Sequence, residues 1–267
     1  MVIFMDTEIK VLKEIKPKKP VFIEGLPGIG GVGRISAQYL IDELKAKKFA
    51  ELYSPYFLPF TSINDGVIHI LKNEFYYVEN KKGNDLIILT GDCQSGDSGT
   101  KGHYEISSKI INFCEKYGVK RIFTLGGFGT GEIEDTKDIE ILGAVSDKKL
   151  MKKYKGKGVD FKSSTKRIQY IVGASGLLIG LGKEKGMEGV CLMGETTGFP
   201  ILTDPRSAEK LLKTLVKILD LDIDLSKIDE KSKKMESFLK RLEVIQEKAM
   251  KKLMPKEKGK EKLRYIG

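Results

Sequence analysis

Residues 21–40 read Val21-Phe-Ile-Glu-Gly-Leu-Pro-Gly-Ile-Gly-Gly-Val-Gly-Arg-Ile-Ser-Ala-Gln-Tyr-Leu40. A short apolar run comes first, a glycine-rich turn follows, and apolar residues then recur at the spacing of a helix. The stretch therefore predicts a strand at Val21–Glu24, a turn, and a helix at Arg34–Lys45.

The turn also has the spacing of the dinucleotide-binding fingerprint. Gly28-Ile-Gly-Gly-Val-Gly33 spells G-x-G-x-x-G, whose glycines allow a tight turn, close approach to a pyrophosphate and close helix–strand packing. An acidic residue roughly twenty positions on, at the end of the second strand, would hold the ribose, but Glu51 lies at the start of the candidate strand. Pro27 directly precedes the motif, and no Gly-Lys-Ser/Thr of a P-loop follows. A packing turn is the favoured interpretation, and a nucleotide or phosphate site stays open.

Further along the chain, apolar strands alternate with helices. The continuous apolar runs at Asp85–Thr90 and Arg121–Leu125 are typical of parallel strands covered on both faces. The alternation predicts the α/β class, a three-layer α/β/α sandwich around a mostly parallel sheet. The other predicted strands are Glu51–Phe60, a pair formed by Gly66–Leu71 and Asn73–Val78, Ile139–Val145 and Gly189–Gly194; the other helices are His103–Tyr117, Asp147–Tyr154, Leu177–Lys185 and Asp204–Leu219.

The pattern changes after residue 225. We expect an α/β/α domain over residues 1–225, an amphipathic helix over 226–254 and a basic, flexible tail over 255–267. In 226–254, apolar residues recur every seven positions from Ile228 to Ala249, although the seam is too weak to predict a coiled coil. Such a helix is expected to pack on its own domain or on a neighbouring subunit.

The net charge of +10 is concentrated at the C-terminal end. Residues 226–267 contain 14 Lys and Arg against 7 Asp and Glu, whereas residues 1–225 contain 33 against 30. A basic segment can bind an acidic protein surface or nucleic acid, but this one lacks the arrayed aromatics that stack on bases. No apolar run approaches the roughly 18–20 residues of a membrane span, and the first residues show no signal-peptide pattern. We therefore expect neither a nucleic-acid partner nor a membrane.

Cysteines and histidines are few. The three cysteines, Cys93, Cys114 and Cys191, are isolated and lack metal-ligand spacing, as expected for free thiols in a reducing cytoplasm. The two histidines, His69 and His103, exclude a His-rich metal site. We therefore expect no metal.

Three glycine loops follow predicted strands and could line one cleft at the sheet edge where α/β proteins bind ligands. They are Gly91–Gly102, Gly126–Gly131 and Gly194–Pro200. No nucleophile–base pair stands out, and Ser95 and Ser98 lack a nucleophile-elbow context. Loop scaffolding is favoured over a hydrolase or phosphorylase. The titratable members of such a cleft would be Asp92, Asp97, His103, Glu132 and Glu195.

Longer motifs stand in series along the chain. The first is Gly25–Leu40, and the second is Tyr117-Gly-Val-Lys-Arg-Ile-Phe-Thr-Leu-Gly-Gly-Phe-Gly-Thr-Gly-Glu132. The third has three parts, Gly176–Gly180, Gly189–Thr197 and Asp204–Leu212. In this order, from about Pro20 to Leu242, the chain resembles the proteasome assembly chaperone family, in its archaeal branch.

This resemblance implies an α/β/α fold akin to nucleoside phosphorylases but without catalysis or a cofactor. It also implies a cyclic homo-oligomer, such as a pentamer, that binds 20S proteasome α-subunits or a related chaperone subunit. The glycine motifs would then shape structural turns and subunit contacts. The residues concerned are Gly25, Gly28, Gly30, Gly33, Gly126, Gly127 and Gly131.

The end of the chain departs from the family pattern. Some archaeal relatives end in a hydrophobic residue, Tyr and any residue, which insert between α-subunits. Here the chain ends Leu263-Arg-Tyr-Ile-Gly267, so Tyr265 is third from the end and follows Arg264. The resemblance implies that Leu263, Tyr265 and Ile266 contact the partner.

Overall fold

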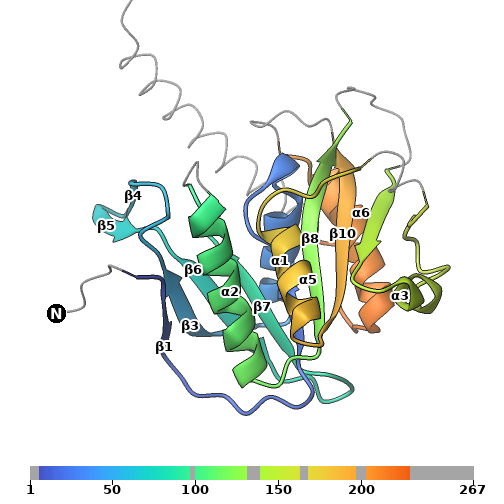
Figure 1. Ribbon diagram of the computed structural model, residues 1–267, viewed down its shortest axis with the longest axis horizontal. Coiled ribbons are helices and arrows are strands. Elements are labelled where there is room, and N and C mark those ends of the chain that lie inside the picture. The colour runs from blue at the N-terminus through green and yellow to red at the C-terminus, as the bar shows by residue number, and fades with distance from the viewer. Residues whose placement is uncertain (1–5, 97–99, 131–138, 163–167, 197–202, 229–267) are drawn as a thin grey trace, which may run out of the picture.

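A computed structural model describes residues 6–96, 100–130, 139–162, 168–196 and 203–228. Strands and helices alternate along these residues (Figure 1). The strands are β1 (Glu8–Val11), β2 (Val21–Glu24), β3 (Lys47–Tyr53), β4 (Thr61–Asn64), β5 (Val67–Ile70), β6 (Asn73–Val78), β7 (Leu86–Gly91), β8 (Arg121–Gly129), β9 (Ile141–Val145) and β10 (Glu188–Thr196). The helices are η1 (Ile29–Gly31), α1 (Val32–Glu43), α2 (Thr100–Lys116), α3 (Lys148–Lys153), α5 (Ala174–Glu184) and α6 (Pro205–Leu219).

Eight strands form one sheet in the order β1-β3-β6-β7-β2-β8-β10-β9. The four central strands, β7, β2, β8 and β10, run parallel to one another. The pairs on both flanks are antiparallel. The predicted α/β fold is confirmed, with its parallel strands at the centre of the sheet.

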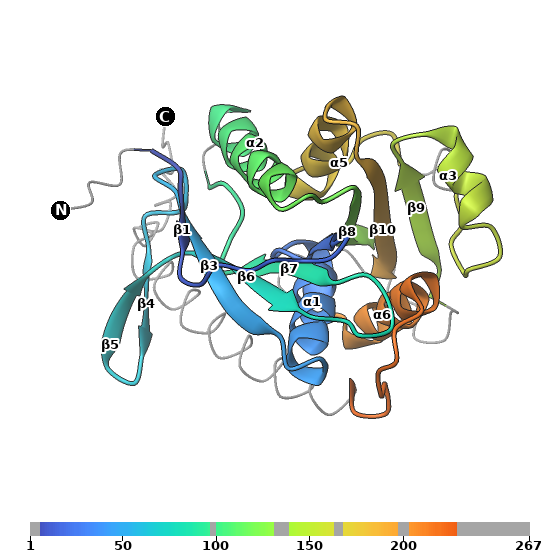
Figure 2. The ribbon, with the colours of Figure 1, turned by 90° about the horizontal axis from the view of Figure 1, so that it is seen from below.

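Helices cover both faces of the parallel strands. Figure 2 shows α2 and α5 on one side of the sheet and α1 and α6 on the other. Each pair buries its apolar residues against the strands and forms a separate core cluster. All four residues of β2 are buried, because the strand lies in the middle of this sandwich.

Local sequence signals set several element ends. Helix α2 is followed by Gly118, whose φ of +76° is the left-handed conformation that glycine favours after a helix. Helix α6 begins with Pro205 after Asp204, whose carboxylate accepts the backbone N–H of Ser207 at 3.1 Å. These two ends agree with the helices predicted at His103–Tyr117 and Asp204–Leu219.

The predicted pairing of Gly66–Leu71 with Asn73–Val78 is wrong. Strand β5 pairs with β4 in a separate two-stranded sheet, whereas β6 lies between β3 and β7. The chain reverses at Asp65-Gly66, where both residues have positive φ, a requirement of tight hairpin turns. Phe75 of β6 is fully buried in the core among other aromatic rings, which holds β6 inside the main sheet.

Several expectations lie outside the described residues. These are Asp97, Gly131, Glu132, the tail residues Leu263, Tyr265 and Ile266, and all but the first three residues of the 226–254 segment. Within the described residues, no helix combines the length and apolarity that crossing a bilayer requires.

Candidate functional site

The four parallel strands end at one edge of the sheet. Strands β2, β7, β8 and β10 end at Glu24, Gly91, Gly129 and Thr196. In open α/β sheets this edge is where ligands bind. The turn at residues 25–33 follows β2 and residues 92–96 follow β7, as the sequence predicted. Of the predicted loop Gly194–Pro200, residues 194–196 belong to β10 and the rest lie outside the described residues.

The first glycine turn is packed against the protein's own backbone. A Cβ atom on Gly25 would lie 2.3 Å from the carbonyl oxygen of Gly33. A Cβ atom on Gly33 would lie 2.1 Å from the carbonyl oxygen of Leu125 in β8. Helix α1 therefore approaches β2 and β8 so closely that only glycine fits at these two positions.

The far side of the turn is also occupied by this chain. Gly30 has a φ of +63° and faces the side chain of Thr196, and its carbonyl oxygen accepts the Asp204 N–H at 2.8 Å. Gly28 is exposed and extended. The turn thus fills much of the space at the strand ends with protein atoms.

Gly126 and Gly127 lie within β8 and not in a turn, which corrects the expectation from sequence. They pair with Met193 and Gly194 of β10. A Cβ atom on Gly127 would lie 2.1 Å from the carbonyl oxygen of Ile29. The missing side chain therefore lets the glycine turn lie directly on the extended end of β8.

Gln94 joins three segments at this edge. Its amide nitrogen donates to the Pro27 carbonyl at 2.7 Å, and its amide oxygen accepts the Ala174 N–H at 2.9 Å. A Cβ atom on Gly173 would lie 2.3 Å from the same oxygen. Gln94 thereby ties the glycine turn and the start of α5 to the loop after β7.

Glu24 is a fully buried carboxylate beneath this loop cluster. It accepts the Leu26 N–H at 2.8 Å and the Ser175 hydroxyl at 3.0 Å. Burial raises the pKa of Glu24 to about 7, although both hydrogen bonds oppose the shift. Its two oxygens are occupied by internal donors, so Glu24 connects β2 to α5.

The other predicted titratable residues are dispersed. Asp92 accepts the Lys72 N–H at 3.0 Å, and Glu195 accepts the Glu140 N–H at 2.9 Å. His103 lies in the first turn of α2. Among the residues that the structure describes, no three His, Cys, Asp or Glu side chains gather as a metal site.

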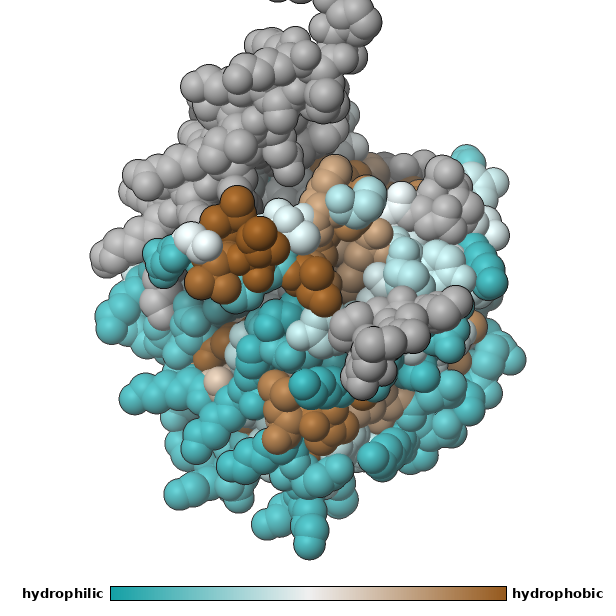
Figure 3. Space-filling model, turned by 90° about the vertical axis from the view of Figure 1, so that its left-hand side faces the viewer, coloured by the Kyte–Doolittle hydropathy of each residue, from teal (hydrophilic) through white to brown (hydrophobic). Residues whose placement is uncertain are grey.

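A second candidate surface is the hairpin β4–β5, which projects from the body (Figure 1). Six apolar side chains on the hairpin and its approach are 39–69% exposed. We call these residues the hairpin patch: Leu58, Phe60, Ile63, Val67, Ile68 and Ile70. Figure 3 shows apolar residues clustered at this place, next to hydrophilic surface. Contiguous exposed apolar surface commonly marks an interaction site.

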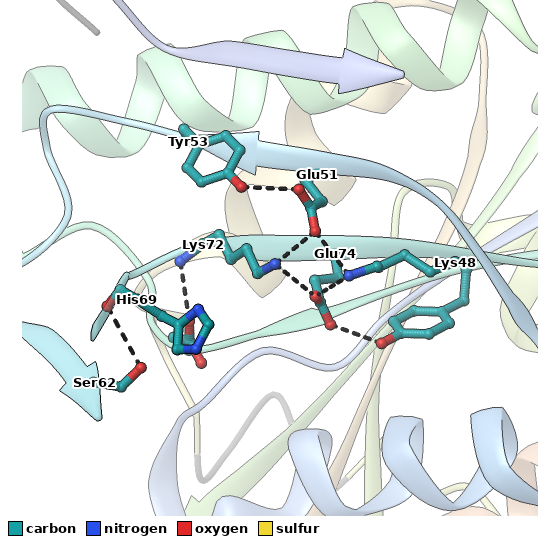
Figure 4. A network of polar contacts seen from close by, with 9 residues as sticks. Lys48, Glu51, Tyr53, Ser62, His69, Lys72 and Glu74 are labelled. Carbon is teal, nitrogen blue, oxygen red and sulfur yellow. Dashed lines mark hydrogen bonds and ion pairs between the residues drawn. The ribbon is translucent and has the colours of Figure 1, made fainter. Parts of the chain in front are cut away.

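Ion pairs anchor the base of the hairpin to the sheet (Figure 4). Lys72, which links β5 to β6, lies 2.5 Å from Glu51 and 3.3 Å from Glu74, and Lys48 contacts the same two carboxylates. Burial disfavours the charge on Glu51, but hydrogen bonds from Lys48, Lys72 and Tyr53 outweigh it and lower the pKa of Glu51 to about 2. The strands that carry the hairpin are therefore held firmly.

Comparison with known proteins identifies the family. The sequence model of the PAC2 family matches residues 22–243. The chain belongs to the PAC2 family. This confirms the resemblance inferred from the motifs.

Solved structures of the PAC2 type share the fold. The archaeal proteasome activator PbaB of Pyrococcus furiosus is 40% identical, with a TM-score of 0.79 over 89% of this chain and 99% of that one. PbaA of the same organism, an archaeal homologue of proteasome-assembly chaperone, is 28% identical, with a TM-score of 0.68 over 93% and 96%. An uncharacterised protein of Methanocaldococcus jannaschii is 34% identical over 96% of both chains.

The sequence does not identify several residues that connect segments at the carboxyl edge of the sheet, nor the hairpin patch. Glu24 has one local signal, a charge ending an otherwise apolar strand. Gln94 and Ser175 have none, because their partners lie 67–151 residues away in sequence. The hairpin patch does have a signal, the Asp65-Gly66 turn between apolar residues.

Proposed function

We propose that this protein is a non-enzymatic scaffold of proteasome assembly that self-associates and binds α-subunits of the 20S core particle or a related assembly partner. The observation that carries the proposal is the 40% identity to an archaeal proteasome activator, which extends over 99% of that protein's chain. The match covers 89% of this chain, with a TM-score of 0.79.

The geometry supports binding more than catalysis. At the carboxyl edge, Gly25, Gly30, Gly33 and Gly127 all face atoms of this chain. Asp92 and Glu195 hold backbone amides, and Glu24 is fully buried. A reacting group needs an accessible, positioned acid, base or nucleophile. The hairpin patch, by contrast, is exposed and suited to a protein partner.

The C-terminal segment is the proposed contact with the core particle. Residues 226–267 carry an excess of positive charge over an otherwise nearly balanced chain. Such a segment is attracted to acidic protein surfaces over a distance set by the ionic strength. Within it, we assign the anchoring side chains to Leu263, Tyr265 and Ile266.

A pull-down with 20S α-subunits tests this proposal. The full chain, a chain ending at Lys262, and the variant Tyr265→Ala are compared, with Lys262→Ala as the matched control in the same tail. We expect the full chain and the control to retain α-subunits, and the other two variants to lose most binding. Absence of α-subunit binding by the full chain would overturn the proposed function. Equal binding by all four would reassign the contact to another surface.

A further inference from the structure

The hairpin β4–β5 has one apolar and one mainly polar face. Cross-strand pairs share a face of an antiparallel ladder, and Ile63 pairs with Ile68 while Thr61 pairs with Ile70. The opposite face carries Ser62 and His69, which pair with each other, and Asn64 and Val67. This alternation is typical of an antiparallel sheet with one face packed and the other in water.

Nothing in the described part of the chain packs on the apolar face. Ile63 is 69% exposed, Ile68 67% and Ile70 48%. Within the same residues, no third strand pairs with β4 or β5. An isolated two-stranded hairpin is only marginally stable in water, and such sheets normally gain stability from further strands or a packed face. We therefore expect another surface to pack on the apolar face of this hairpin.

Charge indicates what covers it. Residues 58–70 contain no Lys, Arg or Glu and a single Asp, in a chain of net charge +10. Like charges on two copies repel where they face each other, although residues 1–225 are nearly balanced, with 33 Lys and Arg against 30 Asp and Glu. The hairpin patch is a place where two copies can meet without that penalty, whereas it offers an acidic partner no complementary charge.

We propose that the hairpin patch packs against the same patch of a second copy of this chain, across a twofold axis. The inference rests on the self-association in the proposed function and names the surface that carries it. A twofold contact is self-complementary, so each residue meets its own counterpart or a neighbour of it. It predicts an even number of subunits and excludes a ring of five built on this contact alone.

The size of the patch fits this assignment. Val67 lies on the opposite face, so the contact would be made by Ile63, Ile68 and Ile70 together with Leu58 and Phe60 on the approach to the hairpin. Five large side chains that are 39–69% exposed present on the order of 500 Å², so two copies would bury about 1,000 Å², near the lower limit of specific interfaces. The same contact would give each hairpin the packed face that it lacks within one chain.

The subunit mass of the intact protein provides the first test. Ile68→Asp places a charge on the apolar face, and Ser62→Asp places the same charge on the opposite face of the same hairpin as the control. Native mass spectrometry of the full chain should show an even-numbered oligomer for the wild type and the control. For Ile68→Asp we expect half that mass or less. Circular dichroism establishes that each variant is folded.

Cross-linking tests the twofold symmetry and does not rely on disruption. Ile68→Cys should form a covalent dimer under mild oxidation, and Ser62→Cys should not. The native Cys93, Cys114 and Cys191 do not compete, because all three are buried and burial raises the pKa of their thiols.

The outcomes separate this inference from the proposed function. An unchanged mass for Ile68→Asp together with no cross-linked dimer of Ile68→Cys would overturn the inference; residues 229–267 or a proteasome subunit would then be the covering surface. A wild type that is monomeric, or has an odd number of subunits, would overturn it as well. Binding of α-subunits is scored separately in the pull-down. An oligomer that persists in Ile68→Asp overturns only this inference, whereas a monomeric wild type would also overturn the self-association in the proposed function.

Discussion

At the scale of the residue, two glutamates show how position alone sets chemistry. Glu24 is fully buried with two neutral hydrogen-bond donors, and burial raises its pKa to about 7. Burial also disfavours the charged form of Glu51, but hydrogen bonds from two lysines and Tyr53 outweigh this effect and lower its pKa to about 2. The difference is the presence of compensating positive charge within hydrogen-bond distance.

This contrast predicts opposite pH dependences of stability. The folded pKa of Glu24 lies above its unfolded value of 4.5, so its contribution is fully present below about pH 4.5 and is lost as pH rises through 7. Across this range the loss amounts to about 3 kcal/mol. In Glu24→Gln the site no longer titrates. Urea unfolding at pH 4.5, 6 and 8 should therefore show that the free energy of unfolding of the variant, relative to that of the wild type, rises with pH by this amount.

Glu51→Gln is the matched control. The folded pKa of Glu51 is depressed, so its contribution is present above pH 4.5 and is lost as pH falls through 2. This variant should be less stable than the wild type at pH 7, and the deficit should shrink toward pH 2. A constant difference between Glu24→Gln and the wild type from pH 4.5 to 8 would contradict the assignment of a buried, titrating Glu24.

At the scale of the element, the contact between α1 and β8 depends on absent side chains. Gly33 lies in the first turn of α1, where the Leu125 carbonyl oxygen occupies the place of a Cβ atom. Gly180 lies in α5 and has open space around its Cβ position. The same residue type therefore has a packing role in one helix and none in the other.

Replacement of each glycine by alanine should separate these roles. In Gly33→Ala the added Cβ atom overlaps the Leu125 carbonyl oxygen, so the backbones of α1 and β8 must move apart. Overpacking of this kind lowers the free energy of unfolding by about 1–3 kcal/mol. Gly180→Ala gains helix propensity and should raise the free energy of unfolding by up to about 1 kcal/mol. Thermal or denaturant unfolding at neutral pH measures both. Equal effects of the two substitutions would show that α1 does not approach β8 as described.

At the scale of the whole molecule, the carboxyl edge of the sheet and the hairpin β4–β5 are the two surfaces that could bind a ligand or a partner. The edge has the location of a nucleotide site, but the turn at Gly28–Gly33 packs against β8, Thr196 and Asp204. The described part of this edge is thus occupied largely by protein. The exposed apolar surface lies instead on the hairpin β4–β5.

We therefore expect no thermal shift with NAD, ATP or nucleosides. A ligand that binds only the folded state raises the melting temperature by mass action. Titration to millimolar concentrations should leave the melting temperature of the full chain unchanged. A saturable rise with any of these ligands would instead favour the nucleotide-binding alternative. The pull-down of α-subunits gives an independent readout of the scaffold function.

Much of the fold was predictable because its signals are local. The apolar runs before Gly25 and Gly91 and at residues 121–125 identify buried strands, and Asp204-Pro205 identifies the start of a helix. Two local signals point elsewhere than the fold does. The Asp65-Gly66 turn pairs β5 with β4 and not with β6, and Gly126 and Gly127 extend β8 instead of forming a turn.

The sequence alone predicts the alternation of strands and helices, a mostly parallel sheet and the resemblance to the proteasome assembly chaperone family, because periodicity and motif order are properties of the chain. The folded arrangement sets which side chains meet. Gln94 joins Pro27 and Ala174, Glu24 meets Ser175, and the backbone of Leu125 fills the space beside Gly33. It also left the apolar face of β4–β5 without a partner in the described chain. Contacts between distant segments depend on strand order and close packing, which no local pattern encodes.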